Sequence, residues 1–408
     1  MEFITSLFFT LMLFLIGTSL FWRFNLASPL NSIRLGRLHY LLLGILLGIF
    51  FPEDDYLFRK LDHLRFGLMG VLLVWFGFRE GTDFDLQNFQ QAPASHIGYR
   101  IVQLLIVFVL VILVAFAATP LLKTYIGLQN HLPLVFLFLG CFALTAMAGP
   151  RLTTGTYSHL TGTLSLPFLN NTTSLFLLGL LTPIFGSPVI QMGPFSFVSY
   201  THIGLVVFAL GLISGIAFDF IFRAYRNGYE CIFLTVATMV TIGGFCTYLK
   251  TPGLFIGFFA GAWLINTTAR KRQVLELTDR TSAVLEPAFF ILAGSIIGGF
   301  GGSPFFKGTM PFMLAFAMLF IRVFAHLAAQ FIGNQLFKQD QSPKASFFEN
   351  WTPLGNLGVA LSIQLLFLPV EFEHNALSAG TLLAVILSQV LWKAPAPKPF
   401  SSQTIAVE

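Results

Sequence analysis

The chain has 408 residues, of which 55% are hydrophobic, 15% aromatic and only 10% charged, with 49 phenylalanines. Together with a mean hydropathy of +0.79, this composition excludes an ordinary soluble domain and indicates a protein that crosses a membrane many times. The net charge of +5 does not call for a nucleic-acid partner, because Lys and Arg accumulate in the cytoplasmic loops of membrane proteins.

Apolar runs long enough to cross about 30 Å of hydrocarbon predict about thirteen membrane helices. In chain order, helices one to seven are expected near 4–22, 37–52, 66–78, 101–122, 132–150, 164–186 and 198–222. Helices eight to thirteen are expected near 230–249, 252–268, 282–300, 309–335, 353–370 and 374–392. The polar stretch from 79 to 100 is predicted to be a loop.

The distribution of basic residues predicts the orientation in the membrane. Arg and Lys gather in the first loop, 23–37, and in the loop after helix nine, 270–280. Because such loops stay in the cytoplasm, the N-terminus is expected outside and the C-terminus inside. Residues 1–392 are then predicted to form a single transmembrane domain, and 393–408 a short cytoplasmic tail.

Signatures of enzymes are missing from the sequence. It contains no Gly-rich phosphate loop, no His pair at helical spacing and no arguable Ser/His/Asp set, so no catalytic activity, cofactor or metal site is predicted. Cys141, Cys231 and Cys246 fall inside predicted helices, and we interpret them as packing residues. Asp219 and Arg223 are one helical turn apart and are expected to form a pair at the cytoplasmic interface.

Two neighbouring amides are the strongest pointer to function. Asn170 and Asn171 lie within the apolar run 164–185, where polar side chains are expensive in hydrocarbon. Thr172 follows them directly. Hydrogen bonding between helices is the alternative role for these residues. Since adjacent helical positions point about 100° apart, only one of the two amides is expected to face a given partner.

Prolines beside small residues suggest two interrupted helices. The residues concerned are Thr145, Gly149 and Pro150 in helix five, and Pro353, Gly355 and Asn356 in helix twelve. Proline removes a backbone donor and frees carbonyl groups, which could line a binding site inside the membrane. A simple helix end is the alternative explanation at each position.

Glycine motifs recur along the chain. Gly44-x-x-x-Gly48 in helix two is matched by Gly257-x-x-x-Gly261 in helix nine, and similar matches join helix three to ten and five to twelve. Each match joins an even-numbered to an odd-numbered helix, which reverses direction across the bilayer, so the matches predict inverted repeats. Close helix packing is the alternative role of such glycines.

Several of these segments resemble the cation/proton antiporter superfamily of sodium/proton exchangers. The likeness rests on the order and spacing of four segments, which are 76–85, Gly257–Gly261, Leu285–Gly294 and Pro353–Leu361. The resemblance implies an all-α membrane fold with inverted repeats and two broken crossing helices. It also implies a panel, a mobile core and a homodimer.

The sequence departs from that family at its ion site. The family depends on a helix-six carboxylate within an Asn-Asp or Asp-Asp pair, and Asn171 stands at the matching position. Gly149-Pro150 likewise replaces an Asp-Pro in helix five. An amide offers oxygen but does not titrate near neutral pH. Glu286 is therefore the best remaining titratable group, and Arg322 is a possible ion-pair partner for it, with a fixed structural bridge as the alternative role.

The sequence thus predicts a secondary active transporter in the cell inner (plasma) membrane that exchanges a monovalent cation for protons by alternating access. Its expected partners are the cation, the proton, the lipid bilayer and a second copy of the chain. Two alternatives stay open. One is a transport-inactive, antiporter-like sensor or assembly protein, and the other is a transporter of a non-cationic solute.

Overall fold

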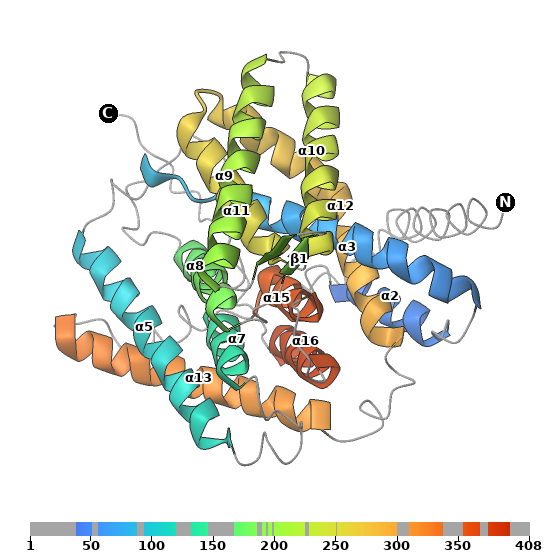
Figure 1. Ribbon diagram of the computed structural model, residues 1–408. Helices are drawn as coiled ribbons and strands as arrows, with labels where there is room; N and C mark the ends of the chain where they lie inside the picture. Colours follow the sequence, from blue (N-terminus) through green and yellow to red (C-terminus); the bar gives the residue numbers. More distant parts are fainter. Residues whose placement is uncertain are drawn as a thin grey trace, which may run out of the picture.

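The computed structural model of the protein describes residues 38–50, 56–87, 94–119, 132–145, 167–185, 190–192, 195–197, 200–224, 228–249, 251–299, 310–337, 354–367 and 374–391. Within these ranges the chain forms twelve α-helices and one short hairpin (Figure 1). Predicted helix one and the predicted tail lie outside the described residues, as do Gly149, Pro150 and Pro353.

Every predicted helix from two to thirteen has a counterpart in the structure. The first six are α2 (Leu38–Phe50), α3 (Tyr56–Thr82), α5 (Ala94–Ala117), α7 (Leu132–Leu144), α8 (Pro167–Phe185) and α9 (Tyr200–Ala224). The other six are α10 (Gly228–Leu249), α11 (Gly253–Thr267), α12 (Lys271–Gly299), α13 (Met310–Phe337), α15 (Asn356–Leu366) and α16 (His374–Leu391).

Helix α3 is much longer than predicted. The sequence suggested 66–78, whereas the helix covers Tyr56–Thr82. The prediction that a loop begins at Arg79 was therefore wrong. Charged residues continue the helix at both ends, and at the C-terminal end Arg79 and Glu80 contact buried partners on α12 and α8. This extension places two charged side chains inside the protein.

A two-stranded antiparallel hairpin, which the sequence analysis did not predict, follows α8. Strand β1 (Ile190–Met192) pairs with β2 (Phe195–Phe197) between α8 and α9. The three cysteines are free and buried, which confirms their interpretation as packing residues.

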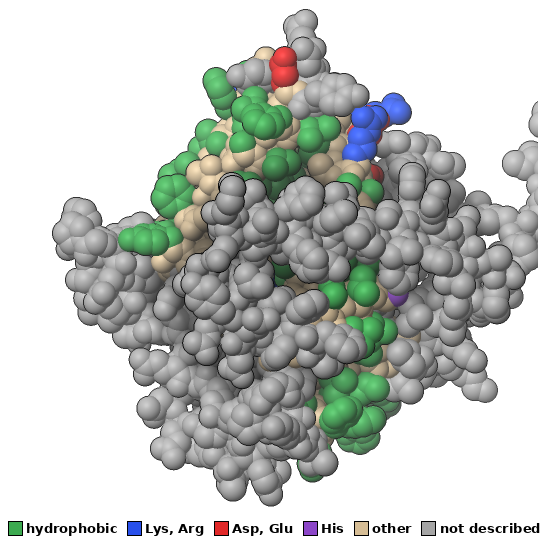
Figure 2. Space-filling view, turned by 90° about the vertical axis from the view of Figure 1, so that its right-hand side faces the viewer, with side chains coloured by type: hydrophobic (Ala, Val, Ile, Leu, Met, Phe, Trp, Pro, Cys, Tyr) green, Lys and Arg blue, Asp and Glu red, His purple; other side chains and the backbone are tan. Residues whose placement is uncertain are grey.

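The described helices are those of a multi-pass membrane protein. Five of them are long and apolar enough to cross a bilayer, namely Ile97–Ala117, Gly204–Ala224, Glu230–Leu249, Lys271–Gly299 and Pro311–Phe337. Large apolar side chains lie exposed on their surfaces, among them Phe320 of α13 at 75% and Phe233 of α10 at 73%. Such surfaces suit contact with lipid. Figure 2 shows hydrophobic side chains over the described part of one face, with Lys, Arg and acidic side chains near its upper end.

The helices pack as two groups. The first bundle consists of α2, α3, α9, α10, α11 and α12, in the upper and right-hand part of Figure 1. The second bundle consists of α5, α7, α8, α13, α15 and α16, in the lower part. Helix α8 packs on α7 and also borders α3, α9 and α11 of the first bundle. Contacts of α8 and α15 with α3 and α11 therefore form much of the boundary between the bundles.

Glycines allow the helices of the first bundle to touch backbone to backbone. A Cβ atom on Gly77 of α3 would overlap the carbonyl of Leu254 on α11, and one on Gly257 of α11 would overlap the carbonyl of Val74. The same relation holds between Gly81 and Phe258. Since the contacts advance along both helices together, α3 and α11 run in the same direction.

Helices α2 and α12 form a second pair of this kind. Gly44 and Gly48 of α2 face the backbone of Ile291 and Ser295, and Gly294 of α12 faces Leu41. The close-packing role of these glycines is thereby confirmed. The inverted repeat itself stays a prediction.

Candidate functional site

A buried carboxylate and a buried amide meet at the boundary between the two bundles. Asn171 Nδ2 of α8 donates a hydrogen bond of 3.1 Å to Glu80 Oε2 of α3. The two residues are only 2% and 7% exposed. An acidic side chain buried in a membrane protein is expensive and usually functional. The partner of the Asn171 amide is thus a carboxylate on a helix far away in the sequence.

Glu80 is the residue that sequence reasoning missed. It was assigned to a polar loop because Arg79, Glu80, Asp83 and Asp85 follow one another closely. The apolar run through 71–78 continues directly into this pair, and α3 retains its helical form to Thr82. A charged residue that directly follows an apolar helical run can still point into the protein. The direct continuation of the run 71–78 into Arg79 and Glu80 was the feature of the sequence that could have indicated this.

The neighbouring residue of α3 forms an ion pair in another direction. Arg79 Nη1 contacts Glu286 Oε1 of α12, and Glu286 is completely buried. Successive residues on a helix point about 100° apart, so Arg79 faces α12 while Glu80 faces α8. The predicted pairing of Glu286 with Arg322 was wrong, because a closer guanidinium on α3 takes its place.

Arg322 instead binds the end of α7. Its Nε donates to the Ala143 carbonyl at 3.1 Å and its Nη2 to the Thr145 carbonyl at 2.8 Å. His326 Nε2, one turn along α13, lies 3.2 Å from the same Ala143 oxygen. The last carbonyls of a helix lack intrahelical donors and carry partial negative charge. A buried cation at this point therefore stabilises a helix that stops inside the protein.

The ends of the two candidate broken helices come together. Helix α7 ends at Leu144, and the buried Thr145 folds back so that its Oγ1 donates to the Phe142 carbonyl at 2.8 Å. Helix α15 begins at Asn356 after an extended Gly355. A Cβ atom on Gly358 would lie 3.4 Å from Thr145 Oγ1. The C-terminal end of α7 thus faces the first turn of α15, and their opposite partial charges attract.

Helix α8 is tied to α7 close to this meeting point. Ser174 Oγ donates to the Cys141 carbonyl at 2.7 Å. Two successive membrane spans run in opposite directions, so one turn back along α8 corresponds in depth to one turn forward along α7. Asn171, one turn before Ser174, therefore lies at about the same depth as Thr145, which is one turn after Cys141. Thr172 is also buried, whereas Asn170 is only half-buried. Asn171 is therefore the amide of the pair that turns inward.

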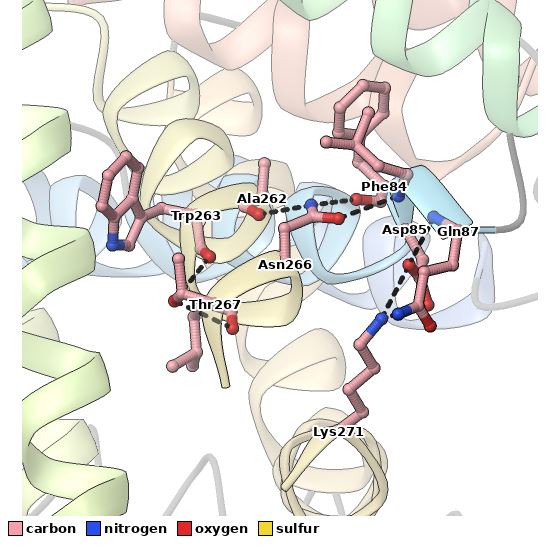
Figure 3. Close-up of polar contacts among 10 residues, drawn as sticks. Phe84, Asp85, Gln87, Ala262, Trp263, Asn266, Thr267 and Lys271 are labelled. Carbon is pink, nitrogen blue, oxygen red and sulfur yellow. Dashed lines mark hydrogen bonds and ion pairs between the residues drawn. The ribbon is translucent and has the colours of Figure 1, made fainter. Parts of the chain in front are cut away.

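A second polar cluster fixes the chain directly after Glu80 (Figure 3). Asn266 of α11 donates from Nδ2 to the Phe84 carbonyl at 2.7 Å and accepts from the Leu86 amide at 2.8 Å. The same Nδ2 donates to the Ala262 carbonyl at 2.7 Å. Lys271, the first residue of α12, forms an ion pair with Asp85 at 2.9 Å. Together these contacts hold the end of α3 against α11 and α12.

One minor prediction is confirmed at the surface. Arg223 Nη2 lies 2.7 Å from Asp219 Oδ2, one turn away on α9. The Arg223 side chain is 68% exposed, as expected of a pair at an interface.

The chemistry available at the site follows from these partners. Glu286 shares its burial with a guanidinium, so its negative charge is balanced by a fixed positive charge. Glu80 accepts a hydrogen bond from an uncharged amide. A carboxylate can in general accept a proton or bind a cation, and the Asn171 amide group carries a neutral oxygen.

Comparisons with known proteins bear on the fold. The sequence matches no protein-family profile, and no similar sequence is found among curated proteins. The structure is similar to that of the sodium/proton antiporter MjNhaP1 from Methanocaldococcus jannaschii at pH 8, with a TM-score of 0.60 and 16% sequence identity. The match covers 96% of this chain and 97% of that chain. At this identity the likeness shows an antiporter-like membrane fold over nearly the whole chain.

Proposed function

We propose that the protein is a secondary active transporter that exchanges a monovalent cation for protons by alternating access. The observation that carries the proposal is the buried hydrogen bond between Glu80 and Asn171. It supplies a titratable oxygen ligand beside the position that holds the carboxylate in the resembled family. The antiporter-like fold over nearly the whole chain supports the same class of transport.

Coupling arises because one carboxylate cannot serve both ions together. When Glu80 is ionised it attracts a cation, and the Asn171 amide group completes the polar surroundings. When Glu80 takes up a proton, it loses its charge and the cation leaves. Glu80 thus replaces Glu286 as the proton-coupling residue in our proposal. Glu286 becomes a structural bridge with Arg79.

Alternating access needs two bodies that move against each other. We assign the first bundle to the panel and the second bundle to the mobile core, within the single domain 1–392. Glu80 belongs to the first and Asn171 to the second, so their contact crosses the boundary. Rocking of the core would open this contact to one side of the membrane at a time. Thr145, Gly149, Pro150, Pro353, Gly355 and Asn356 would form the broken crossing.

The remaining features of the proposal rest on the sequence pattern. The basic loops favour an N-terminus outside and a cytoplasmic C-terminus in the inner (plasma) membrane. The matched glycine motifs favour inverted repeats. The resemblance favours a homodimer.

Flux through proteoliposomes under an imposed pH gradient tests the proposal. Sodium or potassium movement should follow the gradient in the wild type and be lost in Glu80→Gln, which keeps the size but not the charge. Glu276→Gln is the matched control, because Glu276 is half exposed and pairs only one turn away with Arg272. Absence of sodium and potassium flux in the wild type, or flux that survives Glu80→Gln, contradicts the assignment.

A transport-inactive sensor or assembly protein is the second candidate. The amide at position 171 favours it, because the resembled family places its carboxylate there. A wild-type protein that binds neither sodium nor potassium, and in which Asn171→Asp creates pH-dependent flux, would support this second function.

A further inference from the structure

Leu354, two residues before the start of α15, is held by side chains of α16 at both its amide and its carbonyl. The Leu354 amide donates to Ser388 Oγ at 3.1 Å, and Gln389 Nε2 donates to the Leu354 carbonyl at 3.1 Å. Leu354 is completely buried, and Ser388 is 6% exposed. Two successive side chains of α16 therefore satisfy both backbone groups of one residue.

The position of Leu354 explains why such contacts are needed. It precedes Gly355, the extended residue that caps the N-terminus of α15, so it lies outside the hydrogen-bond ladder of that helix. Within a membrane protein, water is not at hand to satisfy backbone groups that a helix leaves free. Buried backbone N–H and C=O groups need hydrogen-bond partners, so side chains must supply them where a helix is interrupted.

Ser388 is set up for this contact by its own helix. Its hydroxyl donates to the Val385 carbonyl at 2.8 Å. A hydroxyl has a single proton to donate and two lone pairs to accept with. The bond to Val385 uses the proton, which leaves the lone pairs for the Leu354 amide. The side chain of Gln389 supplies the complementary donor.

We propose that Ser388 and Gln389 are positioning residues for transport, which hold the entrance of α15 so that its first turn stays opposite Thr145. The inference rests on the proposed function, since it assigns a role in the same site. Gly358, the residue that faces Thr145, lies one turn from Leu354 along the chain. A shift of the entrance would therefore displace the contact between the two helix ends.

A third polar contact between the same helices provides a control. Ser378 Oγ donates to the Ser362 carbonyl at 2.7 Å, and both residues are completely buried. This bond also joins α16 to α15, but it reaches the body of α15, where the helix ladder already serves the backbone. Ser378→Ala thus removes one comparable hydrogen bond without touching the entrance.

The transport arm of the test uses the full chain in proteoliposomes. Ser388→Ala and Gln389→Met should each lower the maximal cation flux about tenfold, in line with the loss of a supporting contact behind a ligand site. Ser378→Ala should stay within about twofold, and Ser388→Thr, which keeps the hydroxyl, should restore flux. Wild-type flux in both entrance variants, or an equal loss in Ser378→Ala, overturns the proposal.

A crosslinking arm separates this inference from the proposed function. Thr145→Cys and Gly358→Cys are combined in a chain whose three native cysteines are replaced by Ala, because a Cβ at Gly358 lies close enough to Thr145 for a disulfide. Ser388→Ala and Gln389→Met should slow crosslinking several-fold, whereas Ser378→Ala should not. Unchanged crosslinking sinks the positioning role. Slowed crosslinking in a protein that moves no sodium or potassium would sink the proposed function alone.

Discussion

Asn171 donates a 3.1 Å hydrogen bond to Glu80, although the two residues are separated by 91 positions in the chain. The bond joins a helix of the second bundle to a helix of the first. Its acceptor is a carboxylate that is only 7% exposed. In the proposed function, Glu80 on α3 takes the proton-coupling role that the sequence had suggested for Glu286 on α12.

Replacing Asn171 by Asp should move the pH dependence of transport. The variant places a second carboxylate beside Glu80, and two carboxylates at this separation cannot both ionise easily. The pair therefore keeps one proton to higher pH, and flux should begin at more alkaline pH than in the wild type. Asn170→Asp is the control, because Asn170 is only half-buried. A pH profile that is unchanged in Asn171→Asp would argue against direct contact with the transported ions.

Breaking the ion pair between Arg79 and Glu286 should destabilise the protein strongly. Removing one partner takes the opposite charge of the ion pair away from the other residue, and breaking a buried ion pair in this way costs about 3–5 kcal/mol. Arg79→Met and Glu286→Gln should each lower the melting temperature in detergent, while the double variant Arg79→Met/Glu286→Met recovers much of the loss.

Flux per folded molecule distinguishes this structural role from a coupling role. It should persist in the double variant, although the protein lacks Glu286. Complete loss of transport in a stable double variant would return Glu286 to the ion pathway.

Arg322 should matter through the end of α7. Arg322→Ala removes the guanidinium donors to the Ala143 and Thr145 carbonyls and leaves His326 Nε2 near the first of them, so both stability and maximal flux should fall. Arg322→Lys keeps the charge but cannot reproduce two bonds from one planar group, and an intermediate effect is expected. The measurements are melting temperature and proteoliposome flux. Should Arg322→Lys equal the wild type in both, a charge alone would suffice at this helix end.

Asn266 should act as a structural clamp behind Glu80. Its amide serves three backbone groups, those of Phe84, Leu86 and Ala262, and a typical intramolecular hydrogen bond contributes about 0.5–1.5 kcal/mol. Asn266→Ala should therefore lower the melting temperature and reduce flux together. Thr267→Ala is a control on the same turn, since the Thr267 hydroxyl bonds to Trp263 and Leu264 of its own helix among the described residues. Equal effects of the two substitutions on melting temperature and flux would show that the contacts of Asn266 between α11 and the end of α3 have no particular importance.

Local sequence determined the membrane class and the approximate position of the helices. A bilayer requires each crossing segment to be apolar over its own length, so a membrane helix can be recognised from its local sequence without knowledge of its neighbours. For the same reason the polar Asn171 stood out within 164–185. Close packing at Gly44, Gly48, Gly257 and Gly261 could also be predicted, because a glycine allows another helix to approach closely whichever helix that is.

Only the tertiary structure decided which charges meet. The pairing of Glu80 with Asn171, of Arg79 with Glu286 and of Arg322 with the end of α7 joins segments far apart in the chain. Whether a charged residue at a helix end enters water or the protein depends on partners that another helix supplies. Hydropathy along the chain does not reveal which residues of other helices become those partners. Glu80 was therefore assigned to a loop, and only the packing of α3 against α8 and α12 shows that it lies in a helix and is buried.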